Sequence, residues 1–315
     1  MMNRTELIRA IKELQLAKNA VVMAHYYQEP EIQDMADFVG DSLALAQKAV
    51  ETDADIIVLA GVNFMAETAK ILNPSKKVLL PDPDAGCSLA DSCPADQFET
   101  FVKAHPGHTV ITYVNTTAAV KALSDIACTS SNAVQIVNSL PKEEKIIFGP
   151  DRNLGNYINS LTHRNMVVWD GACHVHEEFS LEKILELKKE HPDALIVAHP
   201  ECKSVILKIA NHIGSTASLL NFVTKSPNQK FIVATESGIL HEMQKKNPDK
   251  IFIPAPPNDS TCACNECSYM RLNTMEKLYN CLKYETPELF VDEEIRKKAV
   301  KPIQRMLEIS EKLGL

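Results

Sequence analysis

The chain has 315 residues, 45% of them hydrophobic, and its 33 basic and 41 acidic side chains give a net charge of −8. This length is enough for two or three domains with a large core. The sequence contains no basic cluster and no apolar run of membrane-spanning length, so we expect no nucleic-acid or membrane partner and a cytoplasmic location.

Three short apolar segments predict the first strand of three similar units. They are VVMAHYY (21–27), VITYVN (110–115) and LIVAHPE (195–201). Each is followed by a helical stretch and then by a loop of small residues, which reads GDSLAL (40–45), CTSSNA (128–133) or GSTASL (214–219). A spacing of roughly 86 residues is too long for a solenoid repeat and indicates a triplicated small α/β domain.

Each unit contains two more apolar segments that predict strands. These are DIIVLAG (55–61) and KVLLPD (77–82), KIIFGPD (145–151) and MVVWDGAC (166–173), and KFIVATE (230–236) and KIFIPAP (250–256). Helical stretches such as MAETAKIL (65–72) and GILHEMQKK (238–246) separate them. Alternating strands and helices with short loops predict parallel sheets built from βαβ units. Residues 268–315 predict a wholly helical tail that packs back on an earlier domain.

Polar side chains follow the first strand of each unit, where parallel α/β folds bind their ligands. They are His25, Tyr27, Tyr113, Asn115, His199 and Glu201. The small-residue loops add Ser42, Ser130, Ser215 and Thr216. Any one of these hydroxyls has two possible roles, capping a helix or binding an anion at its N-terminus. Their recurrence in all three units favours one shared ligand site, with three separate sites as the alternative.

Nine cysteines in a chain without a signal peptide do not form an obvious disulfide framework. Cys87, Cys173 and Cys267 are spaced by 86 (173 − 87) and 94 (267 − 173) residues and follow the later strands of the three units. Three soft ligands without a fourth are typical of a metal or iron–sulfur centre with one open position. We expect the other isolated cysteines to be small buried hydrophobic residues, namely Cys93, Cys128, Cys202 and Cys281.

Two local motifs keep a zinc site open as an alternative. Cys262, Cys264 and Cys267 form a C-x-C-x-x-C cluster, which indicates metal or redox chemistry. The segment CHVHE (173–177) offers a Cys/His ligand set that would suit zinc. A zinc-dependent enzyme and a cluster-based redox sensor are therefore the alternatives to a catalytic iron–sulfur centre.

Longer strings resemble the quinolinate synthase family, the iron–sulfur enzymes of NAD biosynthesis. They are HYYQEPEIQDMADFVGDS (25–42), GVNFMAETAKILNP (61–74), GCSLADSC (86–93), TYVNTTAAVKALSDIACTSSNA (112–133), FGPDRNLGNY (148–157), CHVHE (173–177), HPEC (199–202), GSTASL (214–219) and ATESGILHEM (234–243). They run in the expected order from about residue 20 to the C-terminus. The resemblance implies three similar three-layer α/β domains in a pseudo-threefold triangle with the active site at its centre. We expect these domains to be 1–87 with 268–315, 88–173 and 174–267.

The resemblance also implies the chemistry. The family condenses iminoaspartate with dihydroxyacetone phosphate and loses phosphate and two waters to give quinolinate. A [4Fe–4S] cluster held by Cys87, Cys173 and Cys267 would act as Lewis acid through its open iron. An aspartate-oxidising enzyme would supply the unstable imine.

The remaining site residues take their expected roles from the same resemblance. Glu201, Tyr27 and Tyr113 resemble the catalytic acid/base groups of the family. The residues that resemble its substrate-binding groups are His25, Ser42, Asn115, Ser130, His199, Ser215 and Thr216. The roles of His176, Cys262 and Cys264 stay open at this point.

Overall fold

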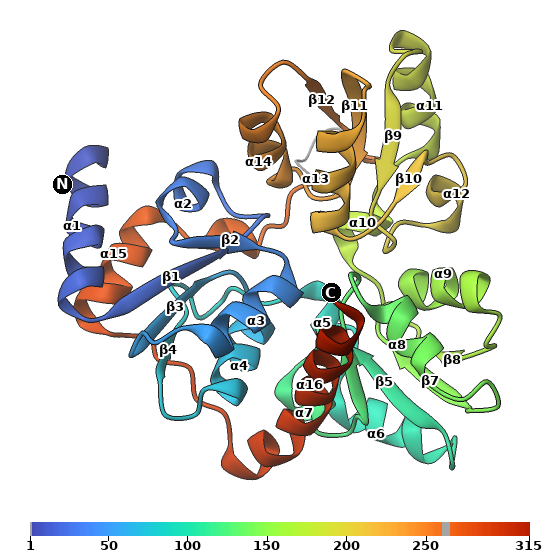
Figure 1. Cartoon of the computed structure of the whole chain (residues 1–315), viewed down its shortest axis with the longest axis horizontal. Coiled ribbons are helices and arrows are strands. Elements are labelled where there is room, and N and C mark those ends of the chain that lie inside the picture. The colour runs from blue at the N-terminus through green and yellow to red at the C-terminus, as the bar shows by residue number, and fades with distance from the viewer. Residues whose placement is uncertain (1, 260–264) are drawn as a thin grey trace.

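The computed structural model describes residues 2–259 and 265–315, so Cys262 and Cys264 lie outside the described residues. Within those ranges the chain forms three parallel sheets of four strands each. Figure 1 shows them as three lobes around a common centre. The predicted α/β class with three similar parallel-sheet units is therefore confirmed. A strict pseudo-threefold relation and the domain limits given above stay predictions.

All three sheets have the same strand order, in which the first strand lies between the second and the third. The first sheet has the order β2-β1-β3-β4 and contains β1 (Ala20–His25), β2 (Phe38–Gly40), β3 (Ile56–Ala60) and β4 (Lys77–Leu79). The second has the order β6-β5-β7-β8 and contains β5 (Thr109–Tyr113), β6 (Ile126–Cys128), β7 (Ile146–Gly149) and β8 (Val167–Val168). The third has the order β10-β9-β11-β12 and contains β9 (Leu195–Ala198), β10 (His212–Ile213), β11 (Lys230–Ala234) and β12 (Ile251–Pro254).

The second strand of each sheet was not predicted from the sequence. β2, β6 and β10 are edge strands of only two or three residues, which is too short for a period-two pattern to be recognised. They lead directly into the small-residue loops, so these edge strands help to place the loops beside the ends of β1, β5 and β9.

Helices connect the strands along the chain. The first part contains α1 (Arg4–Ala17), α2 (Pro30–Met35), α3 (Ser42–Glu51) and α4 (Asn63–Leu72). The middle contains α5 (Ser88–Asp91), α6 (Ala95–Lys103), α7 (Ala118–Lys121), α8 (Ala133–Ser139), α9 (Arg152–Thr162), α10 (His174–Glu177) and α11 (Leu181–Glu190). The last part contains α12 (Ser204–Leu207), α13 (Thr216–Lys225), α14 (Ile239–Lys246), the 3-10 turn η1 (Met270–Leu272), α15 (Met275–Tyr284) and α16 (Glu293–Leu313).

Each sheet is covered on both faces, because alternate strand residues point to opposite sides. In the third sheet Val197 and Val233 pack with α13 and α14, whereas Ile196 and Ile232 pack with α11 and α12. The first sheet is covered in the same way, with α3 and α4 on one face and α1, α2 and α15 on the other. The predicted three-layer arrangement is thus present.

A repeated hydrogen bond supports the internal triplication. The carboxylates of Asp37 and Asp125 each accept from a backbone N–H of the first strand of their sheet, at 2.8 Å from the nitrogens of Val22 and Val110. The side-chain oxygen of Asn211 accepts from Ile196 at the same distance. Each pair is separated by 15 residues, so the same local hydrogen bond recurs in all three units.

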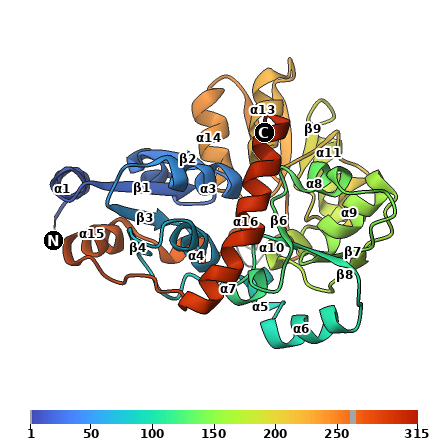
Figure 2. The same cartoon turned by 60° about the horizontal axis from the view of Figure 1, so that its bottom comes forward.

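The C-terminal tail differs from the prediction of a wholly helical segment. Residues 285–292 are not helical, because Glu285 ends α15 with a left-handed backbone (φ 54°) and Pro287 follows it. This stretch instead pairs with β4 through an antiparallel bridge between Leu79 and Glu288. Beyond it, α16 packs against α4, α7 and β6 (Figure 2). Its buried Ile303 belongs to a hydrophobic core that also contains residues of the first and second sheets.

No helix within residues 2–259 and 265–315 has both the length and the apolar character needed to cross a membrane.

Candidate active site

One cavity is lined by residues from the ends of strands in all three sheets. His25 and Tyr113 are the last residues of β1 and β5, and His199 directly follows β9. The cavity brings together every site residue predicted from the sequence except Ser215: His25, Tyr27, Ser42, Cys87, Tyr113, Asn115, Ser130, Cys173, His199, Glu201, Thr216 and Cys267. The residues chosen by the rule that ligands bind at the carboxyl ends of parallel strands therefore meet in one cavity, and their functional roles stay predictions.

Ser215 lies outside this cavity. It is the N-cap of α13, and its hydroxyl accepts a hydrogen bond from the backbone N–H of Ser218 at 3.3 Å. Ser215 instead lines a neighbouring cavity, together with Ser131 and Tyr157. A role for Ser215 in substrate binding stays a prediction, while its neighbour Thr216 does line the central cavity.

The three candidate ligand thiols sit at the start of short helical turns. Cys87 and Cys173 are the N-cap residues of α5 and α10, and Cys267 precedes η1. Burial raises the pKa of the Cys87 thiol to about 12 and raises the pKa values of the Cys173 and Cys267 thiols. Backbone N–H groups of the following turns act in the opposite direction, because their hydrogen bonds favour a thiolate.

These thiols also act on one another. All three residues line the central cavity. Thiolates at Cys87 and Cys267 would add to the rise in the pKa of Cys173 that burial and Glu201 cause. Three thiolates in one cavity repel unless a cation lies among them. A converging set of soft sulfur donors therefore fits an iron–sulfur cluster or another thiophilic metal.

A second possible ligand group shares one of these thiols. Ligand atoms of Cys173, His176 and Glu201 all lie within 4.8 Å of one another, and the two latter residues are buried. One sulfur, one imidazole nitrogen and one carboxylate oxygen are donors that zinc accepts. The structure thus contains a group of residues that can bind a metal.

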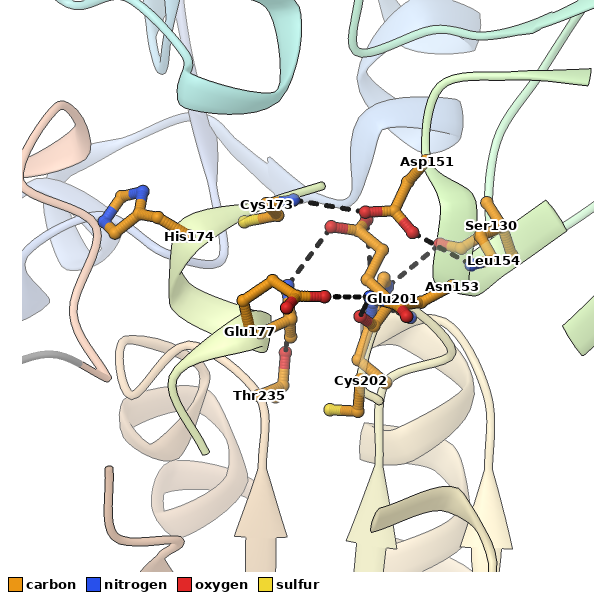
Figure 3. Close-up of polar contacts among 12 residues, drawn as sticks. Ser130, Asp151, Asn153, Leu154, Cys173, His174, Glu177, Glu201, Cys202 and Thr235 are labelled. Atoms are coloured by element: carbon orange, nitrogen blue, oxygen red, sulfur yellow. Dashed lines mark hydrogen bonds and ion pairs between the residues drawn. The ribbon is translucent and has the colours of Figure 1, made fainter. Parts of the chain in front are cut away.

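Glu201 lies at the centre of a buried hydrogen-bond network (Figure 3). The Tyr113 phenol donates to Glu201 Oε1 at 2.6 Å, and His176 Nδ1 lies 3.1 Å from Glu201 Oε2. Burial alone would raise the pKa of Glu201, but its contacts with His176 and His199 and the hydrogen bond from Tyr113 lower it to about 2. Glu201 is therefore an ionised carboxylate that can accept a proton.

The network continues from His176 to the other cavity tyrosine. His176 Nε2 lies 3.0 Å from Thr235 Oγ1, which lies 2.8 Å from the Tyr27 hydroxyl. An ionised Glu201 can only accept, so His176 donates to it from Nδ1. Thr235 lies between His176 Nε2 and the Tyr27 hydroxyl, and a hydroxyl can both donate and accept. The four side chains therefore form one continuous hydrogen-bonded chain between Tyr27 and Glu201.

Both phenols are protonated in this setting. Burial raises the pKa values of Tyr27 and Tyr113 well above the ordinary value for tyrosine, and the negative charge of Glu201 adds to both shifts. Each phenol can therefore donate a proton to a developing negative charge.

Two further histidines of the cavity, His25 and His199, are neutral. The pKa values of His25 and His199 fall to about 3, chiefly because both rings are buried. In each ring Nδ1 accepts from the backbone N–H two residues ahead, that of Tyr27 at 3.2 Å and of Glu201 at 3.4 Å. Nε2 therefore carries the proton, and in His199 it lies 3.2 Å from Ser130 Oγ.

Several residues at this site were missed in the sequence. Asp41 and Glu236 line the cavity, and Thr235 connects Tyr27 to His176. Thr235 and Glu236 end the predicted strand KFIVATE, so the strand-end rule would have found them had it been applied to every strand. Burial raises the pKa of Glu236 to about 7, against the lowering effect of Arg271.

The fold and the site define an α/β enzyme whose central cavity combines three partly buried thiols with an acid/base network. A family model described as "Quinolinate synthetase A protein" (NadA) matches residues 9–308. The quinolinate synthases of Trichodesmium erythraeum and of a Nostoc species are 60% and 61% identical to the chain over 305 residues, which cover 97% of this chain and 94% of each relative. That of Microcystis aeruginosa is 60% identical over the same length, with 95% of the relative covered. The chain belongs to the quinolinate synthase family, which confirms that it is an enzyme acting on small molecules.

Proposed function

We propose that the central cavity condenses iminoaspartate with dihydroxyacetone phosphate to quinolinate, with loss of phosphate and two waters. The observation that carries the proposal is the hydrogen-bonded chain from Tyr27 through Thr235 and His176 to Glu201, with Tyr113 on the other carboxylate oxygen. Such a network can move protons between two sides of one cavity, as dehydration requires.

Substrate binding has to deal with negatively charged groups in an acidic protein. None of the described residues that line the cavity is lysine or arginine. Binding therefore relies on neutral donors and on the N-termini of α3 and α13, which begin at Ser42 and Thr216. The proposed substrate-binding residues are His25, Ser42, Asn115, Ser130, His199, Ser215 and Thr216.

We assign Cys87, Cys173 and Cys267 as the ligands of a [4Fe–4S] cluster. When bound, the cluster would supply a Lewis-acidic iron that polarises a substrate oxygen. The protein contributes three partly buried cysteines and the surrounding backbone N–H groups, which favour the thiolate form.

The resident acid/base groups can carry out one elimination of water with balanced protons. Glu201 accepts a proton from a substrate carbon. Tyr113 gives its phenolic proton to the departing hydroxyl, which leaves as water, and regains a proton from Glu201 across the 2.6 Å hydrogen bond. Tyr27 can likewise take up a substrate proton while its own proton moves through Thr235 and His176 toward Glu201.

The test is an anaerobic assay of quinolinate formation on protein with measured iron and sulfide. We expect about four iron and four sulfide per chain together with turnover. An aspartate-oxidising enzyme can generate the imine in the assay, and we propose an enzyme of this class as the functional partner. Fully loaded protein that makes no quinolinate from the two substrates would refute the proposal.

A mononuclear zinc site is the second candidate for the metal, favoured by the grouping of Cys173, His176 and Glu201. About one zinc per chain without sulfide would support it. For the rest of the biology we propose a cytoplasmic enzyme with no nucleic-acid or membrane partner, consistent with the net charge of −8.

A further inference from the structure

Two buried carboxylates occupy equivalent places in the second and third sheets. Asp151 lies two residues after the end of β7, and Glu236 lies two residues after the end of β11. Both are almost fully buried, at 0% and 1% exposure. Each accepts a hydrogen bond from the backbone N–H of a candidate ligand cysteine: Asp151 Oδ2 from Cys173 at 3.1 Å (Figure 3), and Glu236 Oε1 from Cys267 at 3.1 Å.

The second oxygen of each carboxylate binds the helix that follows the same strand. Asp151 Oδ1 accepts from the backbone N–H of Leu154 at 2.9 Å, in the first turn of α9. Glu236 Oε2 accepts from Gly238 at 2.7 Å, immediately before α14. In each sheet the candidate ligand cysteine lies after the fourth strand, and the carboxylate lies between the third strand and the helix that follows it. The carboxylate therefore connects these two parts of the chain.

Glu236 has an additional partner that reaches the first lobe. Arg271 Nη2 donates to Glu236 Oε1 at 3.0 Å, and Arg271 Nη1 donates to the backbone oxygen of Tyr27 at 2.8 Å. One guanidinium thus compensates the buried charge of Glu236 and links the Cys267 segment to a proposed catalytic tyrosine.

We propose that Asp151 and Glu236 are positioning residues that hold Cys173 and Cys267 in the geometry needed to bind the metal centre. The inference rests on the proposed three-thiol centre. A hydrogen bond to the backbone of a ligand residue fixes where its sulfur can point, and loss of such supporting contacts typically lowers metal affinity by about 10- to 100-fold.

The first lobe serves as an internal comparison because no carboxylate among its described residues makes the equivalent contact there. Val62 occupies the position two residues after β3 and has no carboxylate. There the backbone N–H of Asn63 donates to the backbone oxygen of Ala85 at 2.7 Å, close to Cys87 in the chain. Changes at Asp151 or Glu236 should therefore leave Cys87 unaffected.

The amide variants Asp151→Asn and Glu236→Gln keep the shape and remove one acceptor. Both carboxylate oxygens face backbone N–H donors, so an amide can satisfy only one of them and turns its NH2 group toward the other. Asp125→Asn is a control that makes the same chemical change at an exposed position. Asp125 also accepts from a backbone N–H, outside the cavity, and the equivalent position of the third unit already holds Asn211.

The experiment measures two quantities on the full chain. The first is the rate at which anaerobically reconstituted protein releases iron to a ferrous chelator, where we expect Asp151→Asn and Glu236→Gln to be about 10-fold faster than wild type or more. The second is the iodoacetamide alkylation rate of each thiol in the metal-free chain, read by mass spectrometry. We expect Asp151→Asn to change Cys173 and Glu236→Gln to change Cys267, with Cys87 and the Asp125→Asn control unchanged.

The two readouts separate this inference from the proposed function. Wild-type protein that binds no iron would contradict the three-thiol centre, whereas the alkylation pattern would still test positioning. Folded amide variants that match Asp125→Asn in both measurements would overturn the inference. If an amide variant does not fold, Asp151→Glu and Glu236→Asp keep the charge and displace it by one methylene. Iron release at the wild-type rate from these variants would overturn it equally.

Discussion

Thr235 offers a sharp test of the acid/base network, because its hydroxyl is the connection between Tyr27 and His176. Thr235 is buried at 1% exposure, and its hydroxyl lies 2.8 Å from the Tyr27 hydroxyl and 3.0 Å from His176 Nε2. Thr235→Val keeps the shape and removes both hydrogen bonds. At about 0.5–1.5 kcal/mol for each bond, the free energy of unfolding should fall by roughly 1–3 kcal/mol.

The effect on catalysis should be measurable separately from the effect on folding. Positioned proton transfer contributes about 10²- to 10⁴-fold to rates, and Thr235→Val leaves Glu201 and Tyr113 in place. We therefore expect kcat to fall by about 10- to 100-fold. KM should change little, because Tyr27 and His176 line the cavity and Thr235, which connects them, does not. The assay is anaerobic quinolinate formation on protein of equal iron content.

Two matched variants complete this test. Thr112→Val makes the same substitution at a buried residue of β5, whose hydroxyl donates to Ser124 at 2.9 Å, and should lose stability without losing kcat. Thr235→Ser retains the hydroxyl and should recover most of the rate. A Thr235→Val enzyme with wild-type kcat would show that protons do not pass through this residue.

Three other changes have defined outcomes. Cys87→Ala should abolish iron binding. Cys93→Ala, at a buried position in the core of the second lobe, should leave iron binding intact. Loss of iron in Cys93→Ala would disprove the ligand assignment. Glu201→Gln should retain iron and lose turnover by about 100-fold or more in the same assay, and a near-normal rate would remove Glu201 from the mechanism. Burial lowers the pKa values of His25 and His199 to about 3 in the folded chain, so between about pH 6.5 and pH 3 only the unfolded chain binds a proton at these residues. The free energy of unfolding should therefore fall by up to about 1.4 kcal/mol per pH unit for each histidine as the pH drops through this range. Denaturant midpoints of the metal-free wild-type chain at several pH values should show this loss of stability, and the loss should be smaller in His25→Asn. An equal loss in wild type and His25→Asn would contradict the reasoning.

The sequence by itself determined the strands that build the centre of each sheet and the side chains at their ends. Segments such as VVMAHYY and KFIVATE are continuously apolar because the strands are buried on both faces, and the polar residue that follows marks the end of the strand. That local signal was sufficient to place His25, Tyr113 and Glu201 in one cavity. The edge strands β2, β6 and β10 were missed because they have only two or three residues and do not belong to a longer apolar segment. The equally short edge strands β4 and β8 lie within the apolar segments KVLLPD and MVVWDGAC, which is why those two were predicted.

Only the tertiary structure decided which of these residues act together. The path from Tyr27 to Thr235 and His176 joins residues that are far apart in the chain, and such contacts depend on how the lobes pack rather than on local propensity. The same holds for Asp151, which the sequence shows only as the residue before Arg152. Its contact with the backbone of Cys173 exists because β7 and the segment after β8 end side by side, a relation that no single stretch of sequence contains.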